Sequence, residues 1–147
     1  MEFEGNIKAR KLADQQGVIC DIFYHELSGK TTPDAEMALN LDRNSIIKSL
    51  LLVSKTKYYV GTIILGSNRL DFKKIERLTG YKDLRMASSN DVYDTIGFEV
   101  GGVPPLAFYD KNIPTFIDRE VLKLESVIGA GGTEHHGMKL QPHQLVE

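Results

Sequence analysis

The sequence contains one cysteine, no segment that resembles a secretion leader and no hydrophobic run long enough to cross a bilayer. Because Cys20 is the only cysteine among 147 residues, a disulfide within the chain and a C-x-x-C metal or redox motif are both excluded. The first residues, Met-Glu-Phe-Glu-Gly, include neither a basic nor an apolar segment of the kind that directs export. We therefore expect a cytoplasmic protein with no membrane partner, and the length predicts a single domain over residues 1–147.

Excess positive charge is also missing. The chain has 18 Lys and Arg against 20 Asp and Glu, a net charge of −2, and its pI is near 6.1. This balance argues against a protein that binds nucleic acid over a broad surface, but it is compatible with a local basic patch that grips one end of an RNA. A solvated helix face is the other interpretation of the basic cluster in the chain. The cluster comprises Lys73, Lys74, Arg77, Lys82 and Arg85.

Apolar periodicity and turn residues predict helices interspersed among many short strands, which is typical of an α+β (mixed α/β) fold. We expect a curved mixed β-sheet or partial barrel flanked by helices. The expected helices cover residues 6–16, 33–39, 72–79 after a cap at Asp71, and 89–96 after a cap at Ser88, with a terminal helical turn at 142–145. The expected strands cover residues 18–24, 46–53, 58–65 (the hairpin partner of 46–53), 84–87, 98–100, 106–109, 115–117, 126–128 and 138–140.

Lys48 lies within an otherwise apolar strand. Because side chains alternate along a strand, Lys48 shares one face with Leu50 and Leu52, while Ile47 and Leu51 lie on the other face. Both faces are apolar, which predicts a strand covered on both sides. A buried ammonium must pair, reach solvent or open into a pocket, where it suits a phosphate or a carboxyl-derived oxygen. A lysine that protects an exposed sheet edge is an equally good interpretation.

A rigid loop, Gly101-Gly102-Val103-Pro104-Pro105, follows about fifty residues later. Its glycines allow a close approach of the backbone to a ligand, and its prolines stiffen the chain. Such a loop can present amide groups to an oxyanion, although a tight connection between strands explains it too. A second glycine-rich segment, Gly129 to Thr133, lacks the pattern of a phosphate-binding loop.

Other catalytic patterns are weak. His135 and His136 are adjacent and lie on opposite faces if extended, which is a poor arrangement for holding one zinc ion even with His143 nearby. The sequence has no G-x-S-x-G motif, and Cys20 lies in an apolar strand, so covalent catalysis has little support.

Taken in order along the chain, the motifs resemble those of the YbaK family, whose fold is shared with the editing domain inserted in bacterial prolyl-tRNA synthetases. The resemblance extends over residues 18–145. The motifs that carry it are Tyr24-His25, Glu36-Met37-Ala38, Lys48-Ser49-Leu50, Leu70-Asp71-Phe72-Lys73-Lys74, Met86-Ala87-Ser88, Thr95-Ile96-Gly97, Gly101 to Pro105 and Ile117-Asp118.

The resemblance implies a YbaK-like, free-standing trans-editing deacylase that hydrolyses the ester of a mischarged tRNA carrying a small amino acid. Its partners would be the 3′ end of an aminoacyl-tRNA and, as a further candidate, an aminoacyl-tRNA synthetase, and it implies no metal and no organic cofactor. As catalytic residues it implies Lys48, which positions the acylated end, and the amides of Gly101 and Gly102, which bind the developing oxyanion. The residues expected to bind substrate are Tyr24, His25, Thr62, Val103 and Pro105.

Two positions depart from the family pattern. Pro104 stands where many members have Ser or Thr, and Lys139 stands near an aspartate of members that act on cysteinyl-tRNA. A non-catalytic module that binds tRNA ends or a synthetase is therefore the alternative function, because a fold does not guarantee its chemistry. A binder of small molecules or nucleotides is a third hypothesis.

Overall fold

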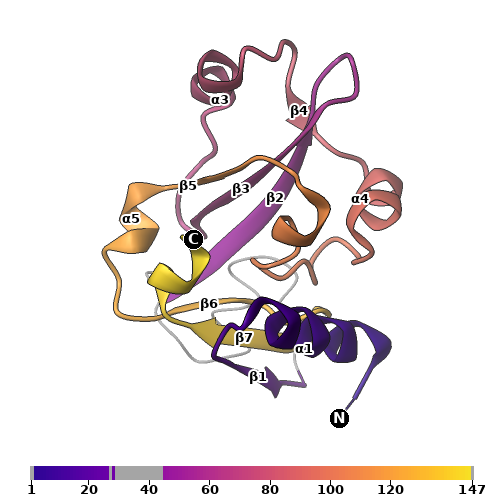
Figure 1. Ribbon diagram of the computed structural model, residues 1–147, viewed down its shortest axis with the longest axis vertical. Coiled ribbons are helices and arrows are strands. Elements are labelled where there is room, and N and C mark those ends of the chain that lie inside the picture. Colours follow the sequence, from indigo (N-terminus) through magenta and orange to yellow (C-terminus); the bar gives the residue numbers. More distant parts are fainter. Residues whose placement is uncertain (1, 27, 29–44, 147) are drawn as a thin grey trace.

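The computed structural model describes residues 2–26, 28 and 45–146, which form a mixed α/β arrangement of two sheets and four α-helices (Figure 1). This confirms the expected fold class. The helix expected at residues 33–39 lies outside the described residues. No helix in the described part is both long and apolar enough to cross a membrane.

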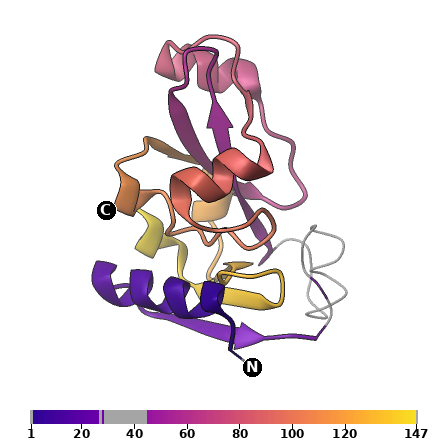
Figure 2. The ribbon, with the colours of Figure 1, turned by 90° about the vertical axis from the view of Figure 1, so that its right-hand side faces the viewer.

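The first sheet has three antiparallel strands in the order β1-β7-β6. Its strands are β1 (Cys20–Tyr24), β7 (His136–Leu140) and β6 (Val127–Ala130). Helix α1 (Glu4–Gln16) lies along this sheet, with Ala9 and Ala13 completely buried (Figure 2). The helix ends at Gly17 in a left-handed conformation, as the sequence predicts.

The second sheet has four strands in the order β4-β2-β3-β5. Its strands are β4 (Arg85–Met86), β2 (Ile47–Val53), β3 (Tyr59–Leu65) and β5 (Thr115–Ile117). The expected hairpin between β2 and β3 is confirmed: Lys48 pairs with Ile64 and Leu50 with Thr62. In contrast, β3 and β5 are parallel.

The two sheets meet at a single parallel bridge between Ile46 and Ile128. Within the described residues the strands therefore form two linked sheets and no closed barrel. The bridge brings the beginning of β2 next to β6 (Figure 1). As a result, the lysine-bearing end of β2 lies at the junction of the sheets.

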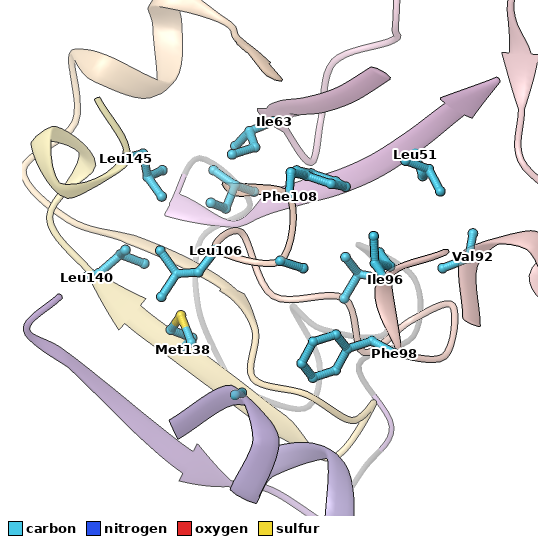
Figure 3. Packing of buried hydrophobic residues seen from close by; sticks show 14 of the residues in the cluster. Leu51, Ile63, Val92, Ile96, Phe98, Leu106, Phe108, Met138, Leu140 and Leu145 are labelled. Atoms are coloured by element: carbon cyan, nitrogen blue, oxygen red, sulfur yellow. The ribbon is translucent and has the colours of Figure 1, made fainter. Parts of the chain in front are cut away.

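The main hydrophobic core lies between the sheets and helices α1 and α4 (Ser89–Ile96) (Figure 3). A smaller core lies on the other face of β2, beneath α3 (Phe72–Thr79), and includes Leu52, Val60 and Ile75. Strand β2 is thus covered on both faces, in agreement with its double apolar pattern. The caps of both helices are also as expected: Asp71 accepts a hydrogen bond from the Lys74 N–H and Ser88 from the Asp91 N–H.

Two expected strands are absent, and one helix was not expected. Residues 98–100 form no strand, and residues 106–109 form turns that lead into a 3₁₀ turn, η2 (Tyr109–Lys111). Leu106 and Phe108 are completely buried in the core, so their apolar character reflects burial rather than strand pairing. The preceding prolines have no N–H for a β-ladder, and the Pro104 carbonyl accepts a turn hydrogen bond from Ala107 instead. The unexpected helix is α5 (Arg119–Leu122), capped by Asp118, and the expected terminal turn is η3 (Pro142–Leu145).

Candidate functional site

A cavity of about 530 Å³ opens beside the first half of β2, where the two sheets meet. Strand β4 pairs with β2 only at Leu52 and Val53, so the residues before them are left at an edge of the four-stranded sheet. The cavity is bordered by this edge, by the segment from Met86 to Val92, by the loop that begins at Val100, and by β6 with the turn before β7. A cavity of this size matches the usual range for small-molecule sites.

Lys48 contributes to the wall of this cavity. Its side chain is half-buried and forms no ion pair or hydrogen bond with any residue that the structure describes. Burial lowers the pKa of the Lys48 ammonium below its ordinary value, because the charged form loses contact with water. An incompletely solvated cation without a partner is well suited to an anionic or carbonyl oxygen, so the geometry fits the pocket interpretation of Lys48.

The Gly-Gly-Val-Pro-Pro loop forms another wall, to which Gly101 and Val103 contribute. Gly101 has φ of +93°, a conformation that favours glycine. The Gly102 N–H donates to the Glu99 carbonyl at 2.9 Å, so this amide is already occupied. By contrast, the N–H groups of Gly101 and Val103 have no hydrogen-bond partner among residues 2–26, 28 and 45–146. The loop's two available amide donors are thus at Gly101 and Val103, whereas the sequence suggested Gly101 and Gly102.

Gly102 fixes the loop to the second glycine-rich segment. Its carbonyl accepts a hydrogen bond from the Gly132 N–H at 3.0 Å, and a Cβ at position 102 would lie 2.8 Å from Thr133 Cα. Gly132 in turn has φ of +104°, and its backbone touches the backbone of Gly5 in α1 so closely that neither residue has room for a side chain. The two glycine-rich segments and the start of α1 therefore form one tightly packed backbone unit behind the cavity.

His136 is a cavity residue that the sequence analysis treated only as a poor metal ligand. It is 3% exposed, and its Nδ1 lies 2.7 Å from Thr133 Oγ1. Thr133 Oγ1 also accepts a hydrogen bond from the backbone N–H of His135, so the threonine hydroxyl connects the two neighbouring histidines. In the described part of the chain, no three His, Cys, Asp or Glu side chains are placed to share a metal ion. Nothing in the sequence analysis had placed His136 at a cavity.

The remaining predicted residues separate into those at the cavity and those away from it. His25 lines the cavity, and its N–H donates to the His135 carbonyl at 2.8 Å. Tyr24 is 37% exposed and lies outside the lining, where its ring stacks on His135 with a centroid distance of 6.3 Å. Pro105 is buried behind the wall, against Gly129.

Thr62 lies on the opposite edge of β2 from the cavity. It belongs to β3, is 1% exposed, and donates its hydroxyl proton to the Leu50 carbonyl at 3.1 Å. Thr62 was chosen because it lies on the strand next to β2. However, β3 covers one edge of β2, and the cavity lies at the other edge. The structure therefore brings together Lys48, Gly101, Val103 and His25, and it separates Thr62 and Pro105 from them.

Ser49 has a buried hydroxyl without a hydrogen-bond partner in the described residues. It follows Lys48 in the cavity-lining part of β2. Buried hydroxyl groups are normally paired, so an orphaned one marks a position where stability is not optimised.

Comparison with known proteins finds relatives with the same fold. A solved structure described as a putative trans-editing enzyme for prolyl-tRNA synthetase superposes with a TM-score of 0.88 and 27% identity, covering 99% of this chain and 92% of that one. A protein of Enterococcus faecalis named putative Cys-tRNA(Pro)/Cys-tRNA(Cys) deacylase EbsC is 27% identical over 109 residues, which are 74% of this chain and 66% of that protein. The proline–tRNA ligase of Shouchella clausii is 30% identical over 114 residues, 77% of this chain but only 20% of the ligase.

The model of the family described as the aminoacyl-tRNA editing domain matches residues 27–147, which is most of the chain. The matched range includes all the cavity residues on β2, the 101–105 loop and β6–β7, so the resemblance to YbaK-like proteins is confirmed. The protein belongs to the aminoacyl-tRNA editing domain family.

Proposed function

We propose that this protein is a trans-editing deacylase that hydrolyses the ester between a small amino acid and the 3′ end of a mischarged tRNA. One observation carries the proposal: Lys48, Gly101 and Val103 line the same cavity, and the Lys48 ammonium and the backbone N–H groups of Gly101 and Val103 have no partner among the described residues. These are a cation and a pair of donors of the kind that an acyl ester requires as its carbonyl oxygen becomes negative. The named relatives supply the substrate class.

The reaction needs little chemistry from side chains. Water attacks the ester carbonyl, the ester C–O bond breaks, the ribose oxygen takes a proton, and the amino acid leaves with its carboxyl group. The amides of Gly101 and Val103 stabilise the oxyanion of the tetrahedral intermediate, while Lys48 holds the acylated end in place. His136, hydrogen-bonded to Thr133, lines the cavity and can orient the water or the amino acid.

One observation favours the alternative of a non-catalytic module that binds tRNA ends or a synthetase. The Gly102 amide, an expected oxyanion donor, is occupied by Glu99, and Pro104 provides neither an N–H nor a hydroxyl group. A site with fewer donors can still bind an ester-bearing end without accelerating its hydrolysis. The two functions differ in turnover and not in binding.

The deciding experiment is deacylation of tRNAs charged separately with Ala, Ser, Cys, Thr and Pro. We expect wild-type protein to hydrolyse one or two of these species, and Lys48→Ala to lower the rate by about 100-fold, because an acylated end that is no longer held in place reacts more slowly by about this factor. Lys11→Ala, on the exposed surface of α1, is the matched control and should retain full activity. Equal activity of Lys48→Ala and wild type would exclude the proposed role of Lys48, and no hydrolysis by wild type would favour the binding module.

A further inference from the structure

Positive charge is strongly concentrated in one part of this acidic protein. Residues 54–87 carry eight Lys and Arg and three Asp and Glu, a net charge of +5. The other 113 residues carry ten basic and 17 acidic residues, a net charge of −7. The overall value of −2 therefore conceals two regions of opposite sign, and only one of them can approach a polyanion favourably.

Seven of these basic residues lie at the end of the molecule opposite the beginning of β2, and we call this surface the basic end. All seven side chains are exposed, and only Lys73 has an ion-pair partner within the described residues, Glu76 at 3.7 Å. Two of the three acids in this region serve the fold: Glu76 accepts a hydrogen bond from the Leu84 N–H, and Asp71 caps α3. Three carboxylates against eight cations still leave this region with a net charge of +5. The basic end comprises Lys55, Lys57, Lys73, Lys74, Arg77, Lys82 and Arg85.

The basic end is a single surface although its residues come from separate elements. It is made by the turn between β2 and β3, by α3, and by the segment that leads to β4, which lie together at the top of Figure 1. The Lys55 N–H donates to the Lys82 carbonyl at 3.3 Å. The rings of Tyr58 and Tyr81 stack with centroids 5.0 Å apart, and Tyr58 is 56% exposed. This backbone pairing and ring stacking hold the turn after β2 against the segment before β4, and Tyr58 adds an exposed aromatic ring beside the charged side chains.

Strands β2 and β4 connect the basic end to the cavity. Lys48 borders the cavity, and β2 runs from there to the turn that carries Lys55, a distance of roughly 20 Å at the usual rise per residue. Met86 lines the cavity while its neighbour Arg85 belongs to the basic end. A tRNA whose ester occupies the cavity must leave it as a single strand of a few nucleotides, followed by the paired acceptor stem. The surface next to the cavity must therefore accept phosphates, and the basic end has the required charge.

We propose that the basic end binds phosphates of the tRNA acceptor stem while the acylated terminus occupies the cavity. This inference rests on the proposed function, because the location of the ester fixes where the stem lies. This binding mode accounts for the separation of charge in the protein. The other 113 residues, with a net charge of −7, repel RNA phosphates, and the basic end attracts them. Contacts of this kind depend on phosphate rather than base identity, so binding should be sensitive to salt and tolerant of stem sequence.

Binding of an uncharged RNA tests the basic end without reference to catalysis. The probe is a fluorescent acceptor-stem hairpin ending in CCA, and the variant is Lys55→Gln/Lys82→Gln/Arg85→Gln. The matched control, Lys11→Gln/Arg119→Gln/Lys123→Gln, removes the same charge from exposed positions elsewhere. By anisotropy across a salt series, we expect the basic-end variant to bind about tenfold more weakly, with the slope of log K against log salt reduced by about two to three. If both triple variants bind the hairpin with the same affinity, the proposal is overturned. An acidic protein would then be the better candidate partner for the basic end.

Hydrolysis of two substrates with the same ester separates this inference from the proposed function. The basic-end variant should lose about tenfold in kcat/KM, through KM, on an acylated hairpin, and should match wild type on an aminoacyl-adenosine, which has no stem. Lys48→Ala should lose activity on both. If wild type hydrolyses neither substrate, the proposed function fails while the binding experiment still decides the basic end. Equal loss on both substrates by the basic-end variant would mean a distorted cavity and would contradict phosphate binding.

Discussion

The two ends of β2 differ in almost every physical respect. At its beginning, Lys48 is a single half-buried cation in a cavity, and the surrounding walls are backbone segments packed so closely that Gly102 has no space for a side chain. At its far end, the turn after β2, helix α3 and the segment that leads to β4 together carry seven exposed cations. The beginning of β2 thus places one cation in a cavity, whereas the far end places seven cations on the exposed surface.

Under the two proposals made above, the two ends of β2 have different roles: ester hydrolysis at its beginning and phosphate binding at its far end. Acceleration of a reaction needs groups held within a fraction of an ångström, which requires dense packing. Holding a polyanion needs net charge and tolerates side-chain motion. We therefore expect substitutions at the beginning of β2 to act on turnover and substitutions at its far end to act on binding or stability.

The largest contrast should come from two glycine substitutions. Gly102→Ala places a Cβ 2.8 Å from Thr133 Cα, so the loop must shift, and we expect kcat/KM to fall by about 10- to 100-fold. Gly80→Ala, at the end of α3, meets no atom within 4 Å but has φ of +79°, so it should cost about 1–2 kcal/mol of stability. Activity per folded molecule should remain normal in Gly80→Ala, as measured by kinetics together with thermal unfolding. Full activity in Gly102→Ala would show that the packing behind the cavity does not position the loop.

Two serines near β2 provide a contrast of intermediate size. Ser54, just beyond the far end, is 1% exposed, and its Oγ accepts a hydrogen bond from the Tyr58 N–H at 3.0 Å. We expect Ser54→Ala to lower the free energy of unfolding by about 1–2 kcal/mol in a urea titration, since it leaves that N–H without this partner. Ser49→Ala removes a buried hydroxyl that has no partner among the described residues, and it should be neutral or slightly stabilising. An equal loss in both variants would indicate that the Ser49 hydroxyl is paired in solution.

The smallest effect should be that of Lys48 on stability. Burial lowers the pKa of Lys48 in the folded state, so the unfolded chain binds more protons in the range between the two pKa values. The charged lysine therefore costs stability at neutral pH, and this cost decreases as the pH rises through that range. We expect Lys48→Met to raise Tm slightly at pH 7 and to lose this advantage at alkaline pH, as measured by thermal unfolding over a pH series. A lower Tm for Lys48→Met at pH 7 would mean that the ammonium has a stabilising partner.

Local sequence signals predicted the elements that local chemistry determines. The caps at Asp71 and Ser88, the left-handed end of α1 at Gly17 and the hairpin that begins with β2 depend on neighbouring residues, and all four are present. Lys48 was nominated for the same reason, because a charge within an apolar strand is visible without tertiary information; the structure places it at the cavity, and its role stays a prediction. Residues 106–109 were assigned wrongly because buried loops and strands have the same apolar composition.

The arrangement of the site depended on contacts that are distant in sequence. Which edge of β2 is open is decided by the two-residue length of β4 and by the bridge from Ile46 to Ile128. This is why Thr62 was nominated although it lies on the closed edge, and why His136 was not nominated. The occupied amide of Gly102 was equally hidden, since its partner Glu99 has no distinguishing feature in the sequence.

The backbone contact between Gly5 and Gly132 has an evolutionary consequence. Helix α1 precedes residue 27, where the match to the family begins, whereas position 132 lies within that match. A side chain at either position would overlap the backbone of the other, so neither position can change by itself while the helix stays in place. Among relatives, a glycine at the first position should therefore be inherited together with a glycine at the second. Lineages that have acquired a side chain at the second position should have lost this helix or moved it.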